Sequence, residues 1–237
     1  MTDNAAATGK WQTAMVVDIK AETPRAKTFR LALAQPSPHL AGQHYVVRLT
    51  APDGYTASRS YSVASPPDGS NAIDLTVERL EAGEVSTFLH DELVIGDELE
   101  VRGPIGGFFV WEADSPALLL AGGSGIVPLM AMLRLARRNK RSDLLRLVVS
   151  VRSAEDLFYA DELIGPEVKV VYTRLPPPGV TRAAGRVTRD DIAPLVVPDV
   201  TAFVCGSSGF ADTASHLVVD LGVPADRVRV ERFGPTA

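Results

Sequence analysis

The stretch SRSYS, from Ser58 to Ser62, combines an arginine, a tyrosine and hydroxyl groups within one expected β-strand. Side chains alternate along a strand, so Arg59 and Tyr61 share one face, and Ser60 and Ser62 share the other. A guanidinium can bind a phosphate, an aromatic ring can pack on a flat ligand, and a hydroxyl can hydrogen-bond beside it. On its own, the pattern is more typical of an ordinary barrel strand with an exposed arginine.

A second group of possible donors follows in EAGEVSTFL, residues 81–89. Gly83, Val85, Ser86 and Thr87 are expected at the start of a helix, where backbone N–H groups and hydroxyls can bind an anion. Together with the arginine of the earlier strand, this helix start could bind a pyrophosphate.

The stretch LLLAGGSGIVPLMAML, residues 118–133, places three glycines between two apolar segments. Such a turn between strand and helix is common in α/β domains, and Gly122, Gly123 and Gly125 then only let the chain reverse. Alternatively the turn binds a phosphate, because glycines allow close backbone approach and helix N–H groups attract anions. Pro128 suits the first turn of the helix. The turn is not the complete G-x-G-x-x-G fingerprint, so the rest of the chain must decide.

The composition of the chain excludes several classes of function. The chain has 237 residues, 46% of them hydrophobic and 22% charged, which is typical of a globular protein with one or two domains. The net charge of −5 argues against a general nucleic-acid or anionic-membrane surface. No signal-peptide pattern or membrane-spanning stretch is present, so we expect a cytoplasmic protein with residues 1–10 disordered.

The single cysteine, Cys205, excludes an intramolecular disulfide and a four-thiolate iron–sulfur cluster built from this chain. The four histidines lack metal-ligand spacing, so we expect no metal site.

The elements that must position these residues fall into two halves. In the first half, six short strands separated by turn residues predict a closed antiparallel barrel, with one helix over 83–93. These strands are expected over 14–23, 27–34, 44–50, 58–65, 71–80 and 97–104.

In the second half, apolar strands alternate with helices, which predicts a doubly wound parallel sheet. Strands are expected over 117–122, 144–151, 168–175, 201–206 and 227–233, and helices over 126–140, 154–163, 188–196 and 208–222. The change in pattern near 112–115 predicts domains over 11–113 and 114–237.

Taken in order, these motifs resemble those of the ferredoxin–NADP reductase superfamily, and the resemblance covers nearly the whole chain. The matching motifs are R-x-Y-S at Arg59, Tyr61 and Ser62; G-x-x-S at Gly83 and Ser86; G-P-x-G-x-F at Gly103, Pro104, Gly106 and Phe108; G-x-G-[IV]-x-P at Gly123, Gly125, Ile126 and Pro128; C-G at Cys205 and Gly206; and E-x-[FY] at Glu231 and Phe233.

The resemblance implies an FAD-binding barrel followed by an NAD(P)-binding α/β domain. It implies FAD contacts from Arg59, Ser60, Tyr61, Ser62, Thr76, Val77, Gly83, Val85, Ser86, Thr87 and Phe233. It implies NAD(P) contacts from Gly123, Ser124, Gly125, Ile126, Pro128, Arg152, Ser153, Cys205 and Gly206. Ser62, Cys205 and Glu231 would be the catalytic residues.

The implied activity is hydride transfer from NAD(P)H to bound FAD, followed by single-electron transfer to a separate carrier of ferredoxin or flavodoxin type, or to an oxygenase partner. The alternatives are a reductase that uses flavin as a substrate and an electron-transfer or regulatory subunit without turnover. Many relatives fuse an iron–sulfur or haem domain, for which this chain has neither the cysteines nor the length. The chain also continues past Phe233 with GPTA, where plant-type members end on the aromatic residue.

Two arginine-containing segments bear on specificity. Arg152 and Ser153 follow the second strand of the α/β domain and favour NADPH, with Arg182 and Arg186 adding positive charge, although Arg152 could instead pair with Glu155 or Asp156. The basic run at 134–141 is either a solvated helix face or a docking surface for an acidic carrier.

Overall fold

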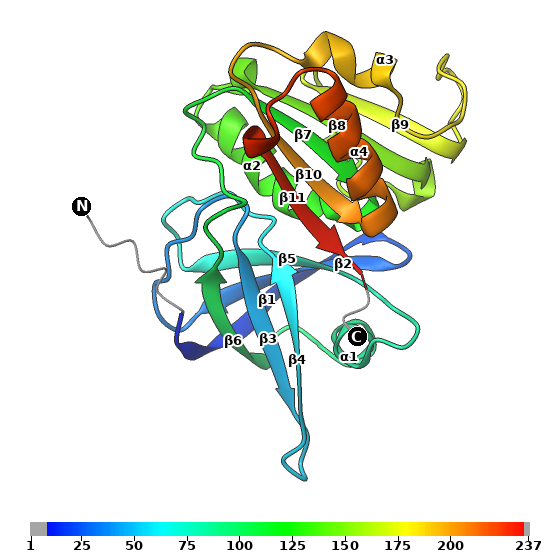
Figure 1. Ribbon diagram of the computed structural model, residues 1–237. Helices are drawn as coiled ribbons and strands as arrows, with labels where there is room; N and C mark the ends of the chain where they lie inside the picture. Colours follow the sequence, from blue (N-terminus) through cyan, green and yellow to red (C-terminus); the bar gives the residue numbers. More distant parts are fainter. Residues whose placement is uncertain (1–8, 235–237) are drawn as a thin grey trace, which may run out of the picture. The chain divides into compact units, whose positions relative to one another are not determined.

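The computed structural model describes residues 9–234 (Figure 1). The chain divides into two compact units, residues 1–110 and residues 111–237, and each is described by itself. The disorder expected for residues 1–10 falls mainly on residues outside the described range. Gly9 and Lys10, which are described, have no regular secondary structure.

The first unit is built on a six-stranded antiparallel sheet, which confirms the six predicted strands. They are β1 (Trp11–Thr23), β2 (Ala26–Leu33), β3 (His44–Thr50), β4 (Thr56–Ser62), β5 (Ala72–Glu78) and β6 (Glu98–Ile105), in the order β4-β3-β6-β1-β2-β5. Beyond the end of β4, a bridge between Val63 and Leu75 and a 2.8 Å hydrogen bond from the Ala64 N–H to the Asp74 carbonyl join the two edge strands. The sheet therefore closes into a barrel.

Alternate residues of these strands fill the barrel. Tyr45 and Val47 of β3 and Val101 of β6 are fully buried in one apolar cluster. The helix α1 (Glu84–Asp91) adds Val85 and Leu89 to the same cluster, because both apolar residues lie on one helix face four positions apart. This packing holds the first turn of α1 beside β4 and β5.

The second unit is a five-stranded parallel sheet flanked by helices. Its strands are β7 (Ala117–Gly122), β8 (Leu145–Ser153), β9 (Val168–Leu175), β10 (Thr201–Ser207) and β11 (Val228–Phe233), in the order β11-β10-β7-β8-β9. Its helices are α2 (Ile126–Arg138), α3 (Arg189–Ile192) and α4 (Ser208–Asp220), with 3₁₀ turns η1 (Gly123–Gly125), η2 (Ser142–Leu144), η3 (Ala154–Asp156), η4 (Ala193–Leu195) and η5 (Ala225–Arg227).

Apolar side chains cover both faces of this sheet. On one face Leu118, Leu120 and Val204 pack with Ala211 and Val218 of α4. The helix α2 packs against β7 and β8, and Figure 1 shows α2 and α4 on opposite sides of the sheet. The fold is therefore the predicted doubly wound α/β arrangement.

The helix predicted over 154–163 is wrong. Only the η3 turn forms there, and the chain then becomes extended at Leu157. Leu157, Phe158 and Tyr159 are buried in succession, which no single helix face permits, and Tyr159 has a φ of 56°. The apolar content that suggested a helix instead packs as an irregular segment.

The helix predicted over 188–196 forms only in part. The four residues of α3 are followed by η4, which contains Pro194. Proline lacks an N–H and disfavours continuation of an α-helix through its own position, so the α-helical stretch ends early.

Two arginines of the basic run at 134–141 bind to residues 162–167, which include the end of the irregular segment 154–163. The Arg134 guanidinium donates to the Glu162 carboxylate at 2.9 Å, and Arg137 donates to the Glu162 carbonyl at 2.6 Å and to the buried Glu167 at 2.9 Å. Arg134 and Arg137 therefore tie α2 to residues 162–167, and neither is a free docking side chain.

Among residues 9–234, no helix is long and apolar enough to cross a membrane.

Candidate cofactor sites

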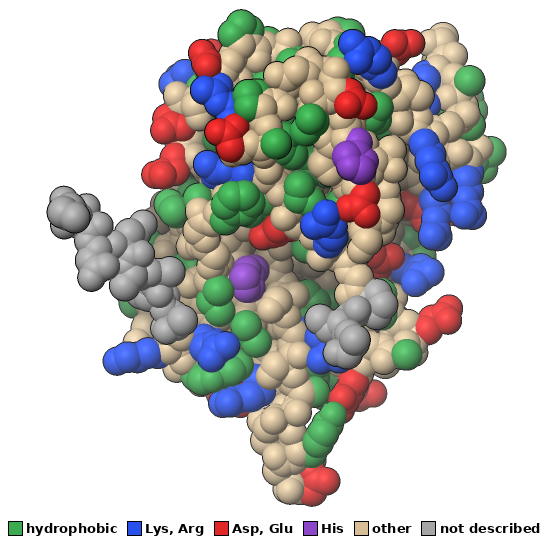
Figure 2. Space-filling view, in the orientation of Figure 1, with side chains coloured by type: hydrophobic (Ala, Val, Ile, Leu, Met, Phe, Trp, Pro, Cys, Tyr) green, Lys and Arg blue, Asp and Glu red, His purple; other side chains and the backbone are tan. Residues whose placement is uncertain are grey.

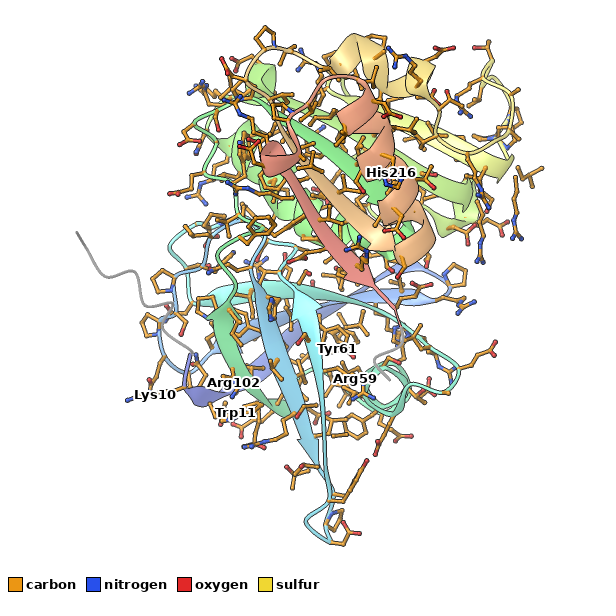
Figure 3. All side chains as sticks on the ribbon, in the orientation of Figure 1. Lys10, Trp11, Arg59, Tyr61, Arg102 and His216 are labelled. Atoms are coloured by element: carbon orange, nitrogen blue, oxygen red, sulfur yellow. The ribbon has the colours of Figure 1, made fainter. Side chains whose placement is uncertain are left out.

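Arg59 and Tyr61 lie on the inner face of β4. Their register partners on β3 are Val47 and Tyr45, which are buried in the barrel core, and opposed residues of antiparallel strands share a face. This confirms that the two side chains lie on one face. Because β4 is an edge strand beside α1, they lie toward the helix, as the labelled side chains of Figure 3 show.

The Arg59 guanidinium is available for a ligand. It is exposed, and its hydrogen bond to the described chain goes to the carbonyl of the adjacent Ser58, at 2.7 Å. Tyr61 is largely buried, and burial raises the pKa of its hydroxyl to about 12, so it stays neutral. A cation thus lies beside an uncharged aromatic ring.

Ser60 and Ser62 differ in their surroundings although both lie on β4. Ser60 is exposed, whereas Ser62, at the end of the strand, is buried with 7% of its surface exposed. Within residues 9–234, the Ser62 hydroxyl makes no hydrogen bond. The Ser62 oxygen is not among the fully buried side-chain atoms that lack a partner, so it keeps access to the surface and can hydrogen-bond to a bound molecule.

The start of α1 is a compact turn that occupies its own hydroxyls. The Ser86 hydroxyl donates to the Gly83 carbonyl at 3.0 Å and accepts from the Leu80 N–H at 3.2 Å. A Cβ on Gly83 would lie 2.3 Å from the Ser86 Oγ, so the turn requires glycine. The Thr87 hydroxyl contacts the Leu80 carbonyl at 3.4 Å. The groups left for an anion are backbone N–H groups of the first turn, including that of Val85.

Thr76 and Val77 are neighbours on β5, so their side chains point to opposite faces of the sheet. The buried Thr76 hydroxyl lies 2.7 Å from the Thr28 hydroxyl on one face, and Val77 belongs to the barrel core on the other. Any cofactor contact from these two residues would use the backbone of their edge strand.

In the second unit, the glycine turn lies where the strand order reverses. The chain runs from β7 to β8 and β9 on one side and returns to β10 and β11 on the other, so the switch point falls between β7 and β10. Open α/β sheets bind ligands at the carboxyl ends of such strands. Gly123 is at the start of η1 with a φ of 56°, and a Cβ there would meet no atom within 4 Å. Its backbone therefore faces open space.

The other glycines of the turn are fixed by packing. A Cβ on Gly125 would lie 2.2 Å from the Cys205 carbonyl oxygen, and a Cβ on Gly122 would lie 2.5 Å from the Phe210 ring. Ser124 is partly exposed, while Ile126 and Pro128 are buried in the start of α2. The turn and the end of β10 are thus in direct contact.

Cys205 and Glu231 lie side by side near the carboxyl end of β10. They are register partners on β10 and β11, and Gly206 and Ser207 oppose Arg232 and Phe233 further along. Burial, followed by the charge of Glu231, raises the pKa of the Cys205 thiol well above its usual value. Burial also raises the pKa of Glu231 to about 7. The thiol is therefore protonated and the carboxyl is half-protonated near neutral pH.

The end of β8 carries Arg152 and Ser153. Ser153 forms a capping box with Asp156, its hydroxyl donating to the Asp156 carboxylate at 2.8 Å. Arg152 is exposed and has no ion pair within the described residues. Arg182 is not available: it donates to both carboxylate oxygens of Asp191, at 2.8 and 2.7 Å.

Phe210 is a site residue that the sequence interpretation missed. Its ring packs over both Gly122 and Gly206. A Cβ on Gly122 would lie 2.5 Å from this ring, and a Cβ on Gly206 would lie 2.8 Å from it. The glycines on β7 and β10 were visible in the sequence, but the aromatic residue that requires them to lack a side chain was not. An aromatic four residues after the C-G motif was the available signal.

Comparison with known proteins identifies both units. Residues 13–110 match the oxidoreductase FAD-binding domain, and residues 119–216 match the oxidoreductase NAD-binding domain. The chain is a flavoprotein oxidoreductase of the ferredoxin–NADP reductase type, comprising the FAD-binding and NAD-binding domains of that family.

Its relatives are longer proteins. The chain is 33% identical over 205 residues to the flavohemoprotein of Pseudomonas putida, covering 83% of this chain and 51% of the relative. It is 32% identical over 209 residues to the NADH oxidoreductase HCR of Escherichia coli, covering 86% of this chain and 63% of the relative. The chain thus spans about half to two thirds of the length of these relatives.

Among solved structures, the flavohem-like FAD/NAD-binding domain of nitric oxide dioxygenase from Vibrio cholerae superimposes with a TM-score of 0.83 at 25% identity, covering 96% of this chain and 100% of that one. Amycolatopsis cytochrome P450 reductase GcoB superimposes with a TM-score of 0.79 at 26% identity, covering 99% of this chain and 74% of that one.

Proposed function

We propose that this protein oxidises NAD(P)H through a bound FAD and delivers the electrons to a separate one-electron carrier. When bound, FAD supplies the redox chemistry, because it accepts a hydride from NAD(P)H and releases electrons singly. The chain's own residues bind the two nucleotides, orient them and control the protonation around them.

In the barrel, Arg59 and the first-turn N–H groups of α1 bind the FAD pyrophosphate. Both supply charge or donors to anionic oxygens, and both lie on the same side of β4. Tyr61 packs on the flavin ring, Ser60 and the backbone of Thr76 and Val77 add contacts, and the hydroxyl of Ser62 hydrogen-bonds to the flavin. Phe233 contributes an aromatic surface.

In the α/β unit, the turn from Gly123 to Gly125 binds the coenzyme pyrophosphate, with Ser124 hydrogen-bonding to the nucleotide. Ile126 and Pro128 hold the turn by packing, and Gly206 admits the Phe210 ring beside it. Cys205 and Glu231 orient the nicotinamide, and as a neutral thiol and a half-protonated carboxyl they add little charge around it. The observation that carries this proposal is the contact of Gly125 with the Cys205 carbonyl, which joins the phosphate-binding turn to the proposed catalytic pair.

Arg152 selects NADPH by binding the 2′-phosphate of the adenosine ribose, and Ser153 adds backbone donors. Support comes from the exposed guanidinium at the end of β8, which has no ion pair among residues 9–234, with Arg186 as a second exposed cation.

The electron acceptor is a ferredoxin- or flavodoxin-type carrier or an oxygenase component. One relative, from Ralstonia, is named the ferredoxin–NAD(P)(+) reductase component of naphthalene 1,2-dioxygenase/salicylate 5-hydroxylase systems, and is 27% identical over 231 residues. No cysteine cluster in this chain could carry such electrons.

The test begins with the visible spectrum of the purified protein before and after reconstitution with FAD. The proposal predicts one FAD per chain that survives gel filtration, and NADPH-dependent reduction of an added [2Fe–2S] ferredoxin. A preparation that retains no flavin after reconstitution would refute bound FAD. A protein that instead reduces free flavin without retaining it would be the flavin reductase.

A further inference from the structure

The outer face of β1 and β6 carries apolar side chains where an antiparallel barrel normally presents polar ones. Ala14 and Val16 point into the core, so Trp11, Thr13, Met15 and Val17 point outward. Met15 is 45% exposed and Val17 is 41% exposed.

The adjacent turn extends this apolar surface. The Gly96 N–H donates to the Val16 carbonyl at 2.8 Å, which places residues 94–97 alongside β1. Val94 and Ile95 in this turn are 58% and 61% exposed. Exposed apolar side chains on a sheet face and in the turn beside it are typical of an interaction surface.

One end of this face is positively charged. Two arginines pack over the Trp11 ring, with the Arg48 Cζ 4.0 Å and the Arg102 Cζ 5.1 Å from its centroid. Arg48 is neutralised by Glu100, to which it donates at 3.0 and 2.7 Å. Arg102 has no ion pair within the described residues, and its buried Nε has no hydrogen-bond partner. Figure 3 shows Lys10, Trp11 and Arg102 together here, and Figure 2 shows the basic side chains gathered on this face.

The register of β1 with β6 makes the face self-complementary. Trp11 opposes Arg102, Thr13 opposes Glu100, and Met15 opposes Glu98. Consider a two-fold axis lying in this face, perpendicular to the strands and through the Thr13–Glu100 pair. It places Arg102 on Glu98 of a second copy and Trp11 on Met15 of that copy, a pairing of sulfur with an aromatic ring.

We infer that this protein forms a two-fold homodimer through the outer face of β1 and β6. The occupant is a second copy because the same face supplies both members of each pair: the unpaired arginine and the exposed glutamate, and the tryptophan and the methionine. The inference does not depend on the proposed enzymatic activity.

Size-exclusion chromatography with light scattering on the full chain tests the dimer. We expect wild-type protein at twice the mass of one chain, and Arg102→Glu and Glu98→Arg variants whose dimer dissociation constants rise at least about tenfold. The double variant R102E/E98R should regain the wild-type mass, because it restores both pairs with reversed charge. Asp226→Arg, at an exposed site in the other unit, is the control and should remain dimeric.

Far-ultraviolet circular dichroism of each variant establishes that it is folded. A wild-type protein that is monomeric throughout the concentration series would overturn the inference. So would single variants that stay as dimeric as wild type, or a folded double variant that remains monomeric.

Discussion

Cys205 and Glu231 are register partners on neighbouring parallel strands, so a thiol and a carboxyl lie side by side at the carboxyl end of the sheet. Burial and then the Glu231 charge raise the pKa of the Cys205 thiol, whereas burial alone raises the pKa of Glu231. Cys205 also contacts Gly125 through its carbonyl, which links this pair to the glycine turn. A change at any of these three positions should therefore affect coenzyme orientation.

Replacing Glu231 with Gln should slow flavin reduction by NAD(P)H by up to about 100-fold, because small misplacements of reacting groups cost rate. The wild-type rate should also change with an apparent pKa near 7, the value to which burial raises the Glu231 pKa. The Gln variant, which cannot ionise, should lose this pH dependence while keeping its FAD. Stopped-flow reduction from pH 5.5 to 8.5 measures both effects; an unchanged pH profile in the variant would remove Glu231 from the site.

The same carboxyl should affect stability in a defined direction. Because the folded pKa is above the usual value for glutamate, the protonated form is favoured by folding, and the stabilisation present below about pH 4.5 is lost as the pH rises through about 7. Denaturant unfolding of wild type and Glu231→Gln at pH 5 and pH 8 should show that the Gln variant is less sensitive to this change.

Replacing Arg59 with Ala should weaken FAD binding by about 10- to 100-fold, because a charge-assisted hydrogen bond is worth about 1.5–3 kcal/mol. Fluorescence titration of the apoprotein with FAD measures the affinity. Arg30→Ala, on β2 and paired with Asp74, is the matched control and should bind FAD normally. Equal affinity of the Arg59 variant and wild type would contradict a pyrophosphate contact.

Replacing Gly125 with Ala should raise the KM for NAD(P)H and destabilise the α/β unit by about 1–3 kcal/mol, because the new methyl group would strike the Cys205 carbonyl. Gly209→Ala offers the control, since a Cβ there meets nothing within 4 Å. Thermal unfolding and steady-state kinetics on both variants make the comparison. If the two variants behave alike, close packing of the turn on β10 does not matter for coenzyme binding.

Replacing Asp191 with Asn should destabilise the fold by about 2–4 kcal/mol. Burial raises the pKa of this carboxyl, but hydrogen bonds from Arg182, Thr188 and Lys169 outweigh burial and hold it well below its usual value. The stabilisation is therefore present above about pH 4 and lost as the pH falls. Urea unfolding at pH 7 measures it, with the exposed neighbour Asp190→Asn as control; similar losses in both variants would argue against the buried ion cluster.

Replacing Arg152 with Ala should lower the ratio of kcat/KM for NADPH to that for NADH by about tenfold or more, equivalent to about 1.4 kcal/mol. Arg227→Ala, at a surface ion pair with Asp199, should leave the ratio unchanged. A wild type that prefers NADH, or a ratio unaffected by the Arg152 change, would show that this guanidinium does not bind the 2′-phosphate.

The local spacing of apolar residues in the sequence predicted most of the fold. The six strands of the barrel and the five of the α/β unit follow from alternation and apolar runs, and α2 and α4 follow from helical spacing. The helix prediction for residues 154–163 was wrong because their apolar side chains are buried one after another in the α/β unit. Sequence periodicity cannot show such packing.

For the candidate sites too, the sequence predicted some features and not others. Motif spacing placed Arg59 with Tyr61 and the glycine turn beside Cys205, because both arrangements are set by strand ends. The partners of single polar groups were not predictable: Ser86 is occupied by its own turn, and Arg182 by Asp191. Such pairings depend on segments brought together only by the folded chain.

Anaerobic mixing of FAD-loaded protein with one equivalent of NADPH tests hydride transfer most directly. The flavin should lose its visible absorbance in a single turnover, more slowly when the transferred hydrogen of the coenzyme is replaced by deuterium. Flavin that stays oxidised with both NADPH and NADH, in protein that has bound FAD, would contradict hydride transfer as the function of this chain.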